Sequence, residues 1–597
     1  MEKWQDKALL EIKKKMRIVD GRNISAEDYP EKRDCYPKLY KYITEHNPDY
    51  NGKICALYGL RRTGKTVMMN QCIAELPPEE KEKSVYILCK ETCDMLEMEQ
   101  VLDELYEKGK RLFFIDEVTL IEDLQVYGNV FSDYYRTMGA KIVIAGTDSF
   151  GIYMAKTDIL YDRTILIHTS QIPYAEFKRI CKKDLDTYIE YGGTLTNTTY
   201  KNNQNANEYL NTAIVENILH GLEGREEKRK HATVLTELYD RNELVSVIQK
   251  MINRFSYEIT MKAINRSYKS APLYATYQTD KSKYQGKLEI MFINDATKSA
   301  LGIKNNDEMQ TVVTQEDLEM IKKYLRFLDL YITIPTFQSL KRGGGRDLEI
   351  LQQPGMIYAH ATELLHQLEQ DNLWNNTCEI EDKTIFMQRA DQFVKGILLE
   401  NIILSETYKC YQEIDRKRFY VSQLSVGPVD DLPDAEADLI IVDMEKKESY
   451  LFEIKHSDQV VDKQTRHLRN EDFINYISEN FAPVKKCCVI YNGQPTRNGA
   501  IDYLNAEKFL MCIHEMDLSK RENLDKLFQT DDNNKKYEQW KQILLFFFYI
   551  FLLEVRRKNE IICLFKNRNQ DEKFEKRKRN FSKKDGRKIE SNPFCIF

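Results

Sequence analysis

Residues 59–66 combine glycines, a lysine and a threonine in a spacing that suits phosphate binding. The apolar run Ile54–Tyr58 leads into this loop, and the segment after it has helical patterning. Backbone N–H groups surround a phosphate only where side chains do not intrude, which explains the glycines. A lysine supplies positive charge for the β- and γ-phosphates, and a threonine hydroxyl at a helix N-terminus is a Mg²⁺ ligand. The residues that fit the pattern G-x-x-x-x-G-K-[ST], and that we predict to bind ATP, are Gly59, Leu60, Arg61, Arg62, Thr63, Gly64, Lys65 and Thr66.

A second group able to do chemistry is the carboxylate pair Asp116 and Glu117. The pair ends the run Arg111–Ile115, which is typical of a buried strand. An acid at the carboxyl end of such a strand can hold Mg²⁺ through its water shell, while its neighbour polarises the attacking water. We therefore assign Asp116 to the metal and Glu117 to the water. Two solvated carboxylates at a strand end are the alternative.

Polar residues also follow the apolar run Lys141–Ala145. If this strand lies beside the phosphate-loop strand, they face the γ-phosphate, and Thr147 is our candidate for sensing it, with Asp148 and Ser149 as alternatives. A helix N-cap explains the same residues. Arg163, just before the apolar run Thr164–His168, is a candidate for reaching the γ-phosphate, in cis or across a subunit boundary. An arginine that is solvated or paired with a surface carboxylate is the alternative. A homo-oligomer is therefore among the assemblies that the sequence allows.

The C-terminal half carries a different set of acids. Asp438 and Glu453-x-Lys455 lie on two strands that read as a hairpin, and alternation places Glu453 and Lys455 on one face. Carboxylates from neighbouring strands can converge on Mg²⁺, while a lysine orients or activates the nucleophile for phosphodiester hydrolysis. Glu400, on a preceding apolar helix, is the candidate third acid, and Gln464 is placed to add a polar contact. A surface ion pair between Glu453 and Lys455 at a strand end is the alternative.

Several elements position these groups. Short apolar runs alternate with helical segments from Ile54 to His168, which predicts an α/β core with a buried parallel sheet. Helical patterning follows, and then two strands at 331–336 and 347–351 joined by a basic tip, Lys341–Arg346. Helices followed by such a ribbon suggest a winged helix whose tip contacts a phosphate backbone. A solvent-exposed hairpin tip is the alternative. A further run, Phe509–Ile513, reads as the last strand of the C-terminal half.

Composition narrows the class of protein. The chain has 597 residues, a formal net charge of −6 and thirteen cysteines. Its length indicates several domains, and its charge excludes a globally basic nucleic-acid coat. Scattered cysteines without a C-x-x-C pair, and an N-terminus without a signal-peptide pattern, predict a cytoplasmic protein. The apolar run Ile543–Leu553 is eleven residues long, too short to span a membrane. The basic stretch after it, Glu572–Lys588, is expected to be disordered.

The sequence resembles a known family at several points along its first half. GLRRTGKT, FFIDE, IAGTDS, IPYAEF and YIEYGG occur in the order found in the AAA-like ATPases of archaea and bacteria, over about residues 30–260. That family commonly carries a C-terminal restriction-endonuclease-like domain of the PD-(D/E)xK type. Asp162-Arg163 and Ile172-Pro173-Tyr174 depart from the family pattern, which usually has Gly-Arg and Pro-Leu/Phe-Ser there. The resemblance implies a P-loop core with its P-loop strand central, followed by a helical lid.

The predicted organisation follows from these observations. We expect a helical lead-in at 1–29, a P-loop ATPase core at 30–193 and a helical lid at 194–300. A winged-helix-like connector at 301–375, a restriction-nuclease-like α/β domain at 376–530 and a tail at 531–597 complete the chain. The first functional hypothesis is a Mg²⁺-dependent ATPase that controls a nuclease or DNA- or RNA-binding C-terminal half. The second is an ATP-driven switch whose nuclease-like fold only recognises a partner.

Overall fold

The computed structural model describes most of the chain up to Glu515. The described residues are 9–45, 47–50, 52–121, 138–146, 164–196, 198–215, 244–270, 315–336, 347–370, 380–412, 417–426 and 435–515. Contacts divide the chain into Met1–Asn523 and Leu524–Phe597, and every described residue belongs to the first unit. The predictions for residues 147–149, Arg163, the basic tip 341–346 and the tail 531–597 fall outside the described residues.

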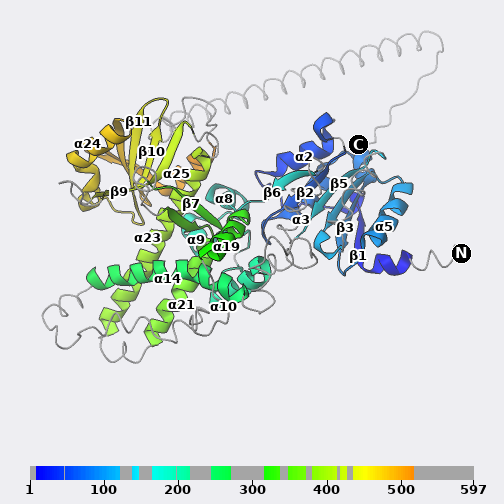
Figure 1. The fold of residues 1–597 in the computed structure, drawn as a ribbon, viewed down its shortest axis with the longest axis horizontal. Helices are drawn as coiled ribbons and strands as arrows, with labels where there is room; N and C mark the ends of the chain where they lie inside the picture. Colours follow the sequence, from blue (N-terminus) through cyan, green and yellow to red (C-terminus); the bar gives the residue numbers. More distant parts are fainter. Residues whose placement is uncertain are drawn as a thin grey trace, which may run out of the picture. The chain divides into compact units, whose positions relative to one another are not determined.

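A six-stranded sheet carries the N-terminal part of the chain (Figure 1). Its order is β1-β3-β4-β5-β2-β6. The strands are β1 (Met16–Asp20), β2 (Ile54–Tyr58), β3 (Ser84–Cys89), β4 (Leu112–Asp116), β5 (Lys141–Ala145) and β6 (Thr164–His168). All neighbours are parallel except β1 and β3. The predicted parallel α/β core is therefore present. β2 is an interior strand, one position from the edge instead of central.

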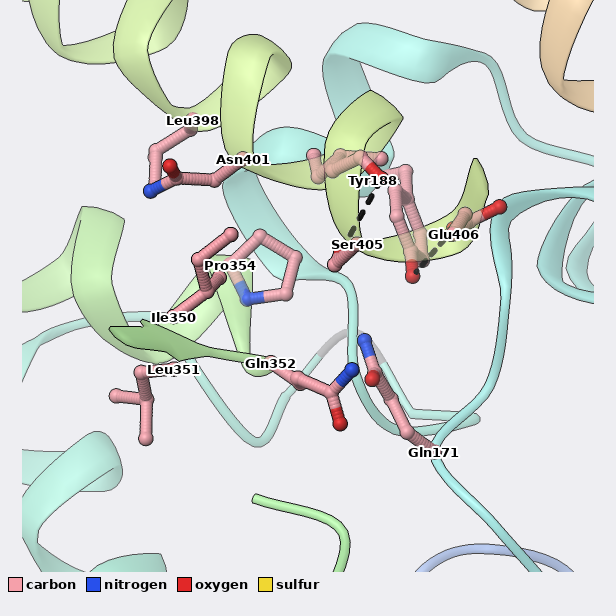
Figure 2. A pocket seen from close by; sticks show the side chains of 11 residues that line it. Gln171, Tyr188, Ile350, Leu351, Gln352, Pro354, Leu398, Asn401, Ser405 and Glu406 are labelled. Atoms are coloured by element: carbon pink, nitrogen blue, oxygen red, sulfur yellow. Dashed lines mark hydrogen bonds between the residues drawn. The ribbon is translucent and has the colours of Figure 1, made fainter. Parts of the chain in front are cut away.

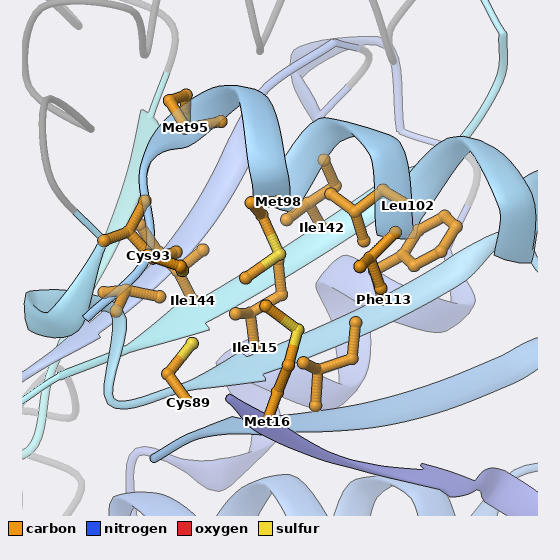
Figure 3. Packing of buried hydrophobic residues seen from close by; sticks show 14 of the residues in the cluster. Met16, Cys89, Cys93, Met95, Met98, Leu102, Phe113, Ile115, Ile142 and Ile144 are labelled. Carbon is orange, nitrogen blue, oxygen red and sulfur yellow. The ribbon is translucent and has the colours of Figure 1, made fainter. Parts of the chain in front are cut away.

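Helices cover both faces of this sheet because its strands are apolar on both sides. On one face, α5 (Met95–Glu107) lays Met98, Val101, Leu102 and Leu105 over β3, β4 and β5. Figure 3 shows Met98 and Leu102 of α5 close to the sheet residues Phe113 and Ile142. A capping box between Asp94 and Glu97 begins the helix. On the other face, α2 (Tyr36–Thr44) and α3 (Lys65–Glu75) bury a second apolar cluster. α4 (Pro78–Lys83) connects α3 to β3.

The expected helical lead-in at 1–29 is wrong in part. Residues 9–14 are helical, but Met16–Asp20 form the edge strand β1, antiparallel to β3. Met16 and Ile18 pack on the α5 side of the sheet and Val19 packs on the other side. This alternation over five residues is the period of a strand, and the charged residues between them masked it.

Helices and a small ribbon form the middle of the chain (Figure 1). They are α8 (Tyr174–Cys181), α9 (Leu185–Tyr191), α10 (Asn203–Tyr209) with a π-helical continuation at Leu210–Val215, α14 (Leu244–Ser270), α19 (Gln315–Phe327) and α21 (Pro354–Gln370). β7 (Tyr331–Ile334) and β8 (Leu348–Leu351) pair antiparallel, as predicted for the ribbon. None of the helices in the described residues is long and apolar enough to cross a membrane.

A second six-stranded sheet carries the C-terminal part, in the order β13-β14-β12-β11-β10-β9. Its strands are β9 (Phe419–Val426), β10 (Ala435–Asp443), β11 (Glu448–Lys455), β12 (Val484–Tyr491), β13 (Thr496–Asn498) and β14 (Ile501–Asn505). β9, β10 and β11 are antiparallel neighbours, whereas β12 is parallel to β11 and β14. The helices are α23 (Ile380–Gln412), α24 (Glu471–Asn480) and α25 (Ala506–Glu515). The hairpin predicted to carry Asp438, Glu453 and Lys455 is the β10–β11 pair.

The strand predicted at Phe509–Ile513 is wrong, because these residues lie in α25. Ala506, Phe509, Leu510 and Ile513 are buried, at spacings of three, four and seven residues from the first. These spacings place the four residues on one face of a helix. A run of five apolar residues fits a helix and a strand equally, so the run alone could not distinguish them.

Candidate functional site

The loop between β2 and α3 has the backbone that phosphate binding requires. Gly59 and Gly64 have φ of 142° and 92°, a region that residues with side chains rarely adopt. A Cβ on Gly59 would lie 2.3 Å from Thr169 Oγ1, so this position is also sterically closed to larger residues. Arg62 has φ of 65°, and its carbonyl accepts a hydrogen bond from Leu195 N. The N-terminus of α3 begins at Lys65, directly after Gly64.

Lys65 is buried within this loop. Its Nζ donates to the carbonyls of Gly59 and Leu60, at 2.7 and 2.8 Å. Burial lowers its pKa to about 8, against the attraction of Asp116 and Glu117. An anionic phosphate would compete with these carbonyls for the ammonium group. Lys65 is thus held inside the loop in which the sequence predicts the β- and γ-phosphates.

Thr66 and Asp116 are brought together across the end of the sheet. Thr66 Oγ1 donates to Asp116 Oδ2 at 2.6 Å, and Tyr86 Oη donates to the same oxygen at 2.8 Å. Asp116 is 3% exposed. A hydroxyl and a carboxylate are hard oxygen ligands of the kind that Mg²⁺ takes from proteins, with water and phosphate completing its shell. The two predicted metal ligands therefore fit Mg²⁺. Tyr86 is a contact that sequence reasoning missed.

Glu117 follows directly, with an unusual backbone. Its φ and ψ are 56° and 43°, the left-handed region, and its N–H donates to Asp116 Oδ1 at 3.0 Å. Residues other than glycine, asparagine or aspartate rarely adopt this conformation, and they do so preferentially at functional sites. The turn places the Glu117 side chain just beyond the end of β4, next to Asp116.

β5 lies between β2 and β4, so its carboxyl end adjoins the phosphate loop as expected. Gly146 is the last described residue there, and a Cβ on it would lie 3.2 Å from side-chain atoms of Val118 and Thr119. The candidates Thr147, Asp148 and Ser149, and likewise Arg163, stay predictions because they are outside the described residues.

Arg33 also contacts the loop, and sequence reasoning did not single it out. Its guanidinium donates to Thr63 O, to Ser170 O at 3.0 Å and, through Nε, to Glu176 Oε1 at 2.6 Å. Arg33 and Glu176 are 4% and 2% exposed. Arg33 lies outside any helix or strand, before α2.

This region also matches a known protein family. Residues 51–178 match the family described as the AAA domain. We refer to this matched region as the AAA domain. It holds the phosphate loop, Asp116 and Glu117, and it ends within α8. No curated protein matches the chain.

Solved structures show distant likenesses. Hsp104 of S. cerevisiae, in a complex with casein, is 11% identical with a TM-score of 0.23, over 33% of this chain and 37% of the Hsp104 chain. Orc1 of Aeropyrum pernix, in complex with DNA, is 12% identical with a TM-score of 0.22, over 59% of this chain and 98% of that one. Cdc6p from Pyrobaculum aerophilum is 11% identical with a TM-score of 0.21, over 59% and 99%. This chain thus spans well under two thirds of the Hsp104 chain.

A second group of predicted residues, from the C-terminal half of the chain, lines one pocket. A pocket of about 740 Å³ is lined by Glu400 of α23, Asp438 of β10, and Glu453 and Lys455 of β11. Lys455 Nζ lies 2.9 Å from Asp438 Oδ2 and 2.8 Å from Glu453 Oε2, and Ile454 N donates to Asp438 Oδ2. The four predicted side chains therefore share one pocket. The side chain of Gln464 lies outside the described residues, so its predicted polar contact stays a prediction.

The electrostatics of this pocket are those of crowded, buried acids. Burial, with the charge of Asp438, raises the pKa of Glu400 to about 8 and that of Glu453 to about 7. Within the described residues, no three His, Cys, Asp or Glu side chains are arranged to hold a metal ion. Lys455 instead bridges the two strand carboxylates.

Helices α8 and α9 connect the AAA domain to this pocket. Glu176 of α8 binds Arg33 beside the phosphate loop. Asp186 of α9 lies 2.8 Å from Nε2 of His456, which follows Lys455 and lines the pocket. Glu190 of α9 binds Lys395 of α23 at 2.7 Å. One segment of fewer than twenty residues thus contacts both candidate sites.

A small cavity lies at the junction of α9, β8 and α23 (Figure 2). Gln171 and Gln352 point toward each other there, and Glu406 accepts hydrogen bonds from Tyr174 N at 2.8 Å and Tyr188 Oη at 3.4 Å. Its volume of about 10 Å³ has room for about one water. The cavity is too small for a substrate, so it belongs to the packing between these elements.

Proposed function

We propose that this protein is a Mg²⁺-dependent ATPase whose nucleotide state controls a nucleic-acid-directed, nuclease-like site in residues 376–530. The AAA domain supports the ATPase activity. The observation that carries the coupling is the α8–α9 segment, which binds Arg33 beside the phosphate loop through Glu176 and His456 beside Lys455 through Asp186.

The residues of the phosphate loop and of the end of β4 have separate proposed roles in ATP hydrolysis. Backbone N–H groups of residues 59–66 hold the β- and γ-phosphates, and Lys65 exchanges its carbonyl partners for phosphate oxygens. Thr66 and Asp116 would hold Mg²⁺, which would neutralise the charge that develops on the phosphate oxygens. Glu117 accepts a hydrogen bond from the attacking water and orients it toward the γ-phosphorus. Thr147 and Arg163 are the proposed γ-phosphate contacts.

The nuclease-like site is proposed on the chemistry of its side chains. Within the described residues these acids are not arranged to hold a metal ion, so Asp438, Glu453 and Glu400 would have to converge once Lys455 leaves them. A divalent ion held there would supply an activated water and stabilise the charged phosphorane. Lys455 would leave the carboxylates and orient the nucleophile. The chain's own contribution is the pairing of β10 and β11, which holds Asp438 and the Glu453–Lys455 face together.

A cleavage assay tests this proposal. Full-length protein is incubated with single- and double-stranded DNA and RNA, with Mg²⁺ or Mn²⁺, with and without ATP. We expect ATP-dependent cleavage that Glu453→Ala and Lys455→Ala abolish. Glu448→Ala is the matched control, since Glu448 lies on the same strand and binds Lys485 away from the pocket. No cleavage by wild type under any condition, or equal cleavage by Glu453→Ala, refutes the nuclease activity.

The second candidate function is an ATP-driven switch whose pocket binds a partner without cleaving it. The bridge from Lys455 to both carboxylates favours this alternative, because it neutralises the groups that a metal needs. ATP-dependent binding of a nucleic acid without cleavage, lost in Lys455→Ala, is the result that distinguishes the switch from the nuclease.

A further inference from the structure

Arg33 is a buried charge that nothing in the AAA motifs explains. It lies in the irregular segment before α2 and is 4% exposed. Removing a guanidinium from water costs several kcal/mol unless it is paired and hydrogen-bonded. Glu176 supplies the opposite charge, and the two terminal nitrogens donate to the backbone carbonyls of Thr63 and Ser170. The phosphate loop is thus one of the three partners of this buried fork.

The contact with Thr63 constrains the peptide that precedes Lys65. A trans peptide is planar, so its C=O and its N–H point in opposite directions. With Thr63 O held by Arg33, the Gly64 N–H must point away from Arg33. Gly64 has φ of 92°, and a glycine here leaves this peptide free to rotate unless something holds it. A flipped peptide would turn a carbonyl, not an N–H, into the phosphate cradle.

The other hydrogen bonds of Thr63 that we describe involve its side chain, whereas Arg33 binds its backbone carbonyl. Thr63 Oγ1 donates to Leu60 O at 2.7 Å and lies 2.9 Å from Thr169 Oγ1, so the side chain is anchored within the loop and to the segment after β6. Arg33 binds that same segment through Ser170 O. The planar fork can satisfy the three acceptors at fixed angles, which the single ammonium of a lysine cannot do.

We propose that Arg33 is a positioning residue of the ATPase reaction, which locks the Thr63–Gly64 peptide so that the Gly64 N–H faces the bound phosphates. Glu176 keeps the guanidinium in place. Because the Gly64 N–H is present equally for ATP, ADP and the transition state, the lock strengthens binding of all three. Losing it weakens nucleotide binding and leaves turnover at saturation nearly intact.

The test uses full-length protein and two variants. Arg33→Lys keeps the charge and removes the fork. The double variant Arg33→Met/Glu176→Gln removes the buried pair together, so that no uncompensated charge remains. We expect the Kd for ADP and the KM for ATP to rise about tenfold in both, as for one lost charge-assisted hydrogen bond. We expect kcat to change by less than about threefold.

Arg179→Lys is the matched control. Arg179 donates to Lys32 O and Asp34 Oδ1 on the same segment, and none of its hydrogen bonds within the described residues reaches the phosphate loop. Wild-type Kd for ADP in Arg33→Lys contradicts the proposal, as does an equal loss in Arg179→Lys. If neither Arg33 variant yields folded protein by circular dichroism, Arg33 is structural and the proposal is wrong.

Discussion

Glu406→Gln is predicted to stabilise the protein, increasingly so at higher pH. Glu406 is 6% exposed and accepts hydrogen bonds from Tyr174 N and Tyr188 Oη at the contact between α23 and the α8–α9 segment. Burial raises its pKa from 4.5 to about 7, against the hydrogen bond from Tyr174. A glutamine keeps the acceptor oxygen and never ionises, so it resembles the protonated carboxyl.

The sign and size follow from proton linkage. A raised folded-state pKa means that the folded protein holds its proton where the unfolded chain has lost it, so stability falls as pH rises from about 4.5 to about 7. A difference of about 2.5 units corresponds to about 3 kcal/mol at full ionisation. The variant escapes this loss. Its advantage over wild type should therefore grow by about 2 to 3 kcal/mol from pH 5 to pH 8.

Thermal unfolding at several pH values measures this difference. For a cooperative unit of about 150–250 residues, we expect the Tm difference between variant and wild type to widen by about 5–10 °C from pH 5 to pH 8. Glu507→Gln is a control of opposite sign. Glu507 accepts from Leu185 N at 3.0 Å and binds Lys178, and its pKa is lowered despite burial. It should be less stable than wild type at pH 8 and approach it at low pH. A Glu406→Gln difference that is constant with pH refutes the reasoning.

Three further predictions concern the ATPase site. Glu117→Gln should bind ATP as wild type does while turnover falls by about a hundredfold or more, and equal turnover would overturn its assignment as the residue that activates water. Tyr86→Phe should lower kcat/KM for Mg-ATP by about tenfold, because Asp116 loses one of its hydrogen bonds; an unchanged value at several Mg²⁺ concentrations would remove Tyr86 from the site. ATP affinity, measured by calorimetry, should weaken as pH rises from 7 to 9, since phosphate binds protonated Lys65 and its pKa is lowered to about 8. A Lys65→Ala protein should bind ATP too weakly to show that pH dependence.

Most strands and motifs of the AAA domain could be predicted, because each depends on a short stretch of neighbouring residues. The strands β2, β5 and β6 occur at the predicted residues, because short apolar runs that alternate with helical segments are typical of the strands of a parallel sheet. The phosphate loop and Asp116–Glu117 are local too, because glycines and strand-end carboxylates carry their chemistry in their spacing. Residues of this kind can be assigned before any fold is known.

The contacts that sequence reasoning missed are long-range. Arg33 is separated from Thr63 by 30 residues and from Glu176 by 143. An arginine in an irregular segment is usually solvated, so only its burial marks it as part of the site. Tyr86 is similar: it sits in an apolar strand, and its hydroxyl gains meaning only when β3 pairs with β4 beside Asp116. The helix α25 was missed for a different reason, because five apolar residues fit both periods.

The C-terminal pocket combines residues that could be predicted from local sequence with a contact that could not. The face shared by Glu453 and Lys455 follows from strand alternation, and their meeting with Asp438 follows from the hairpin. The link from His456 to Asp186 spans 270 residues and has no local pattern. This link is the part of the account on which control of the pocket by ATP depends.

Hydrogen exchange in full-length protein tests that control most directly. Glu117→Gln is loaded with Mg-ATP, and exchange is followed in peptides covering α8–α9 and residues 453–457, with Lys65→Ala as the variant that does not bind nucleotide. We predict that ATP changes exchange at the phosphate loop, in α8–α9 and at 453–457 in Glu117→Gln, and nowhere in Lys65→Ala. Protection of the phosphate loop by ATP, with unchanged exchange at 453–457, would contradict the proposed coupling.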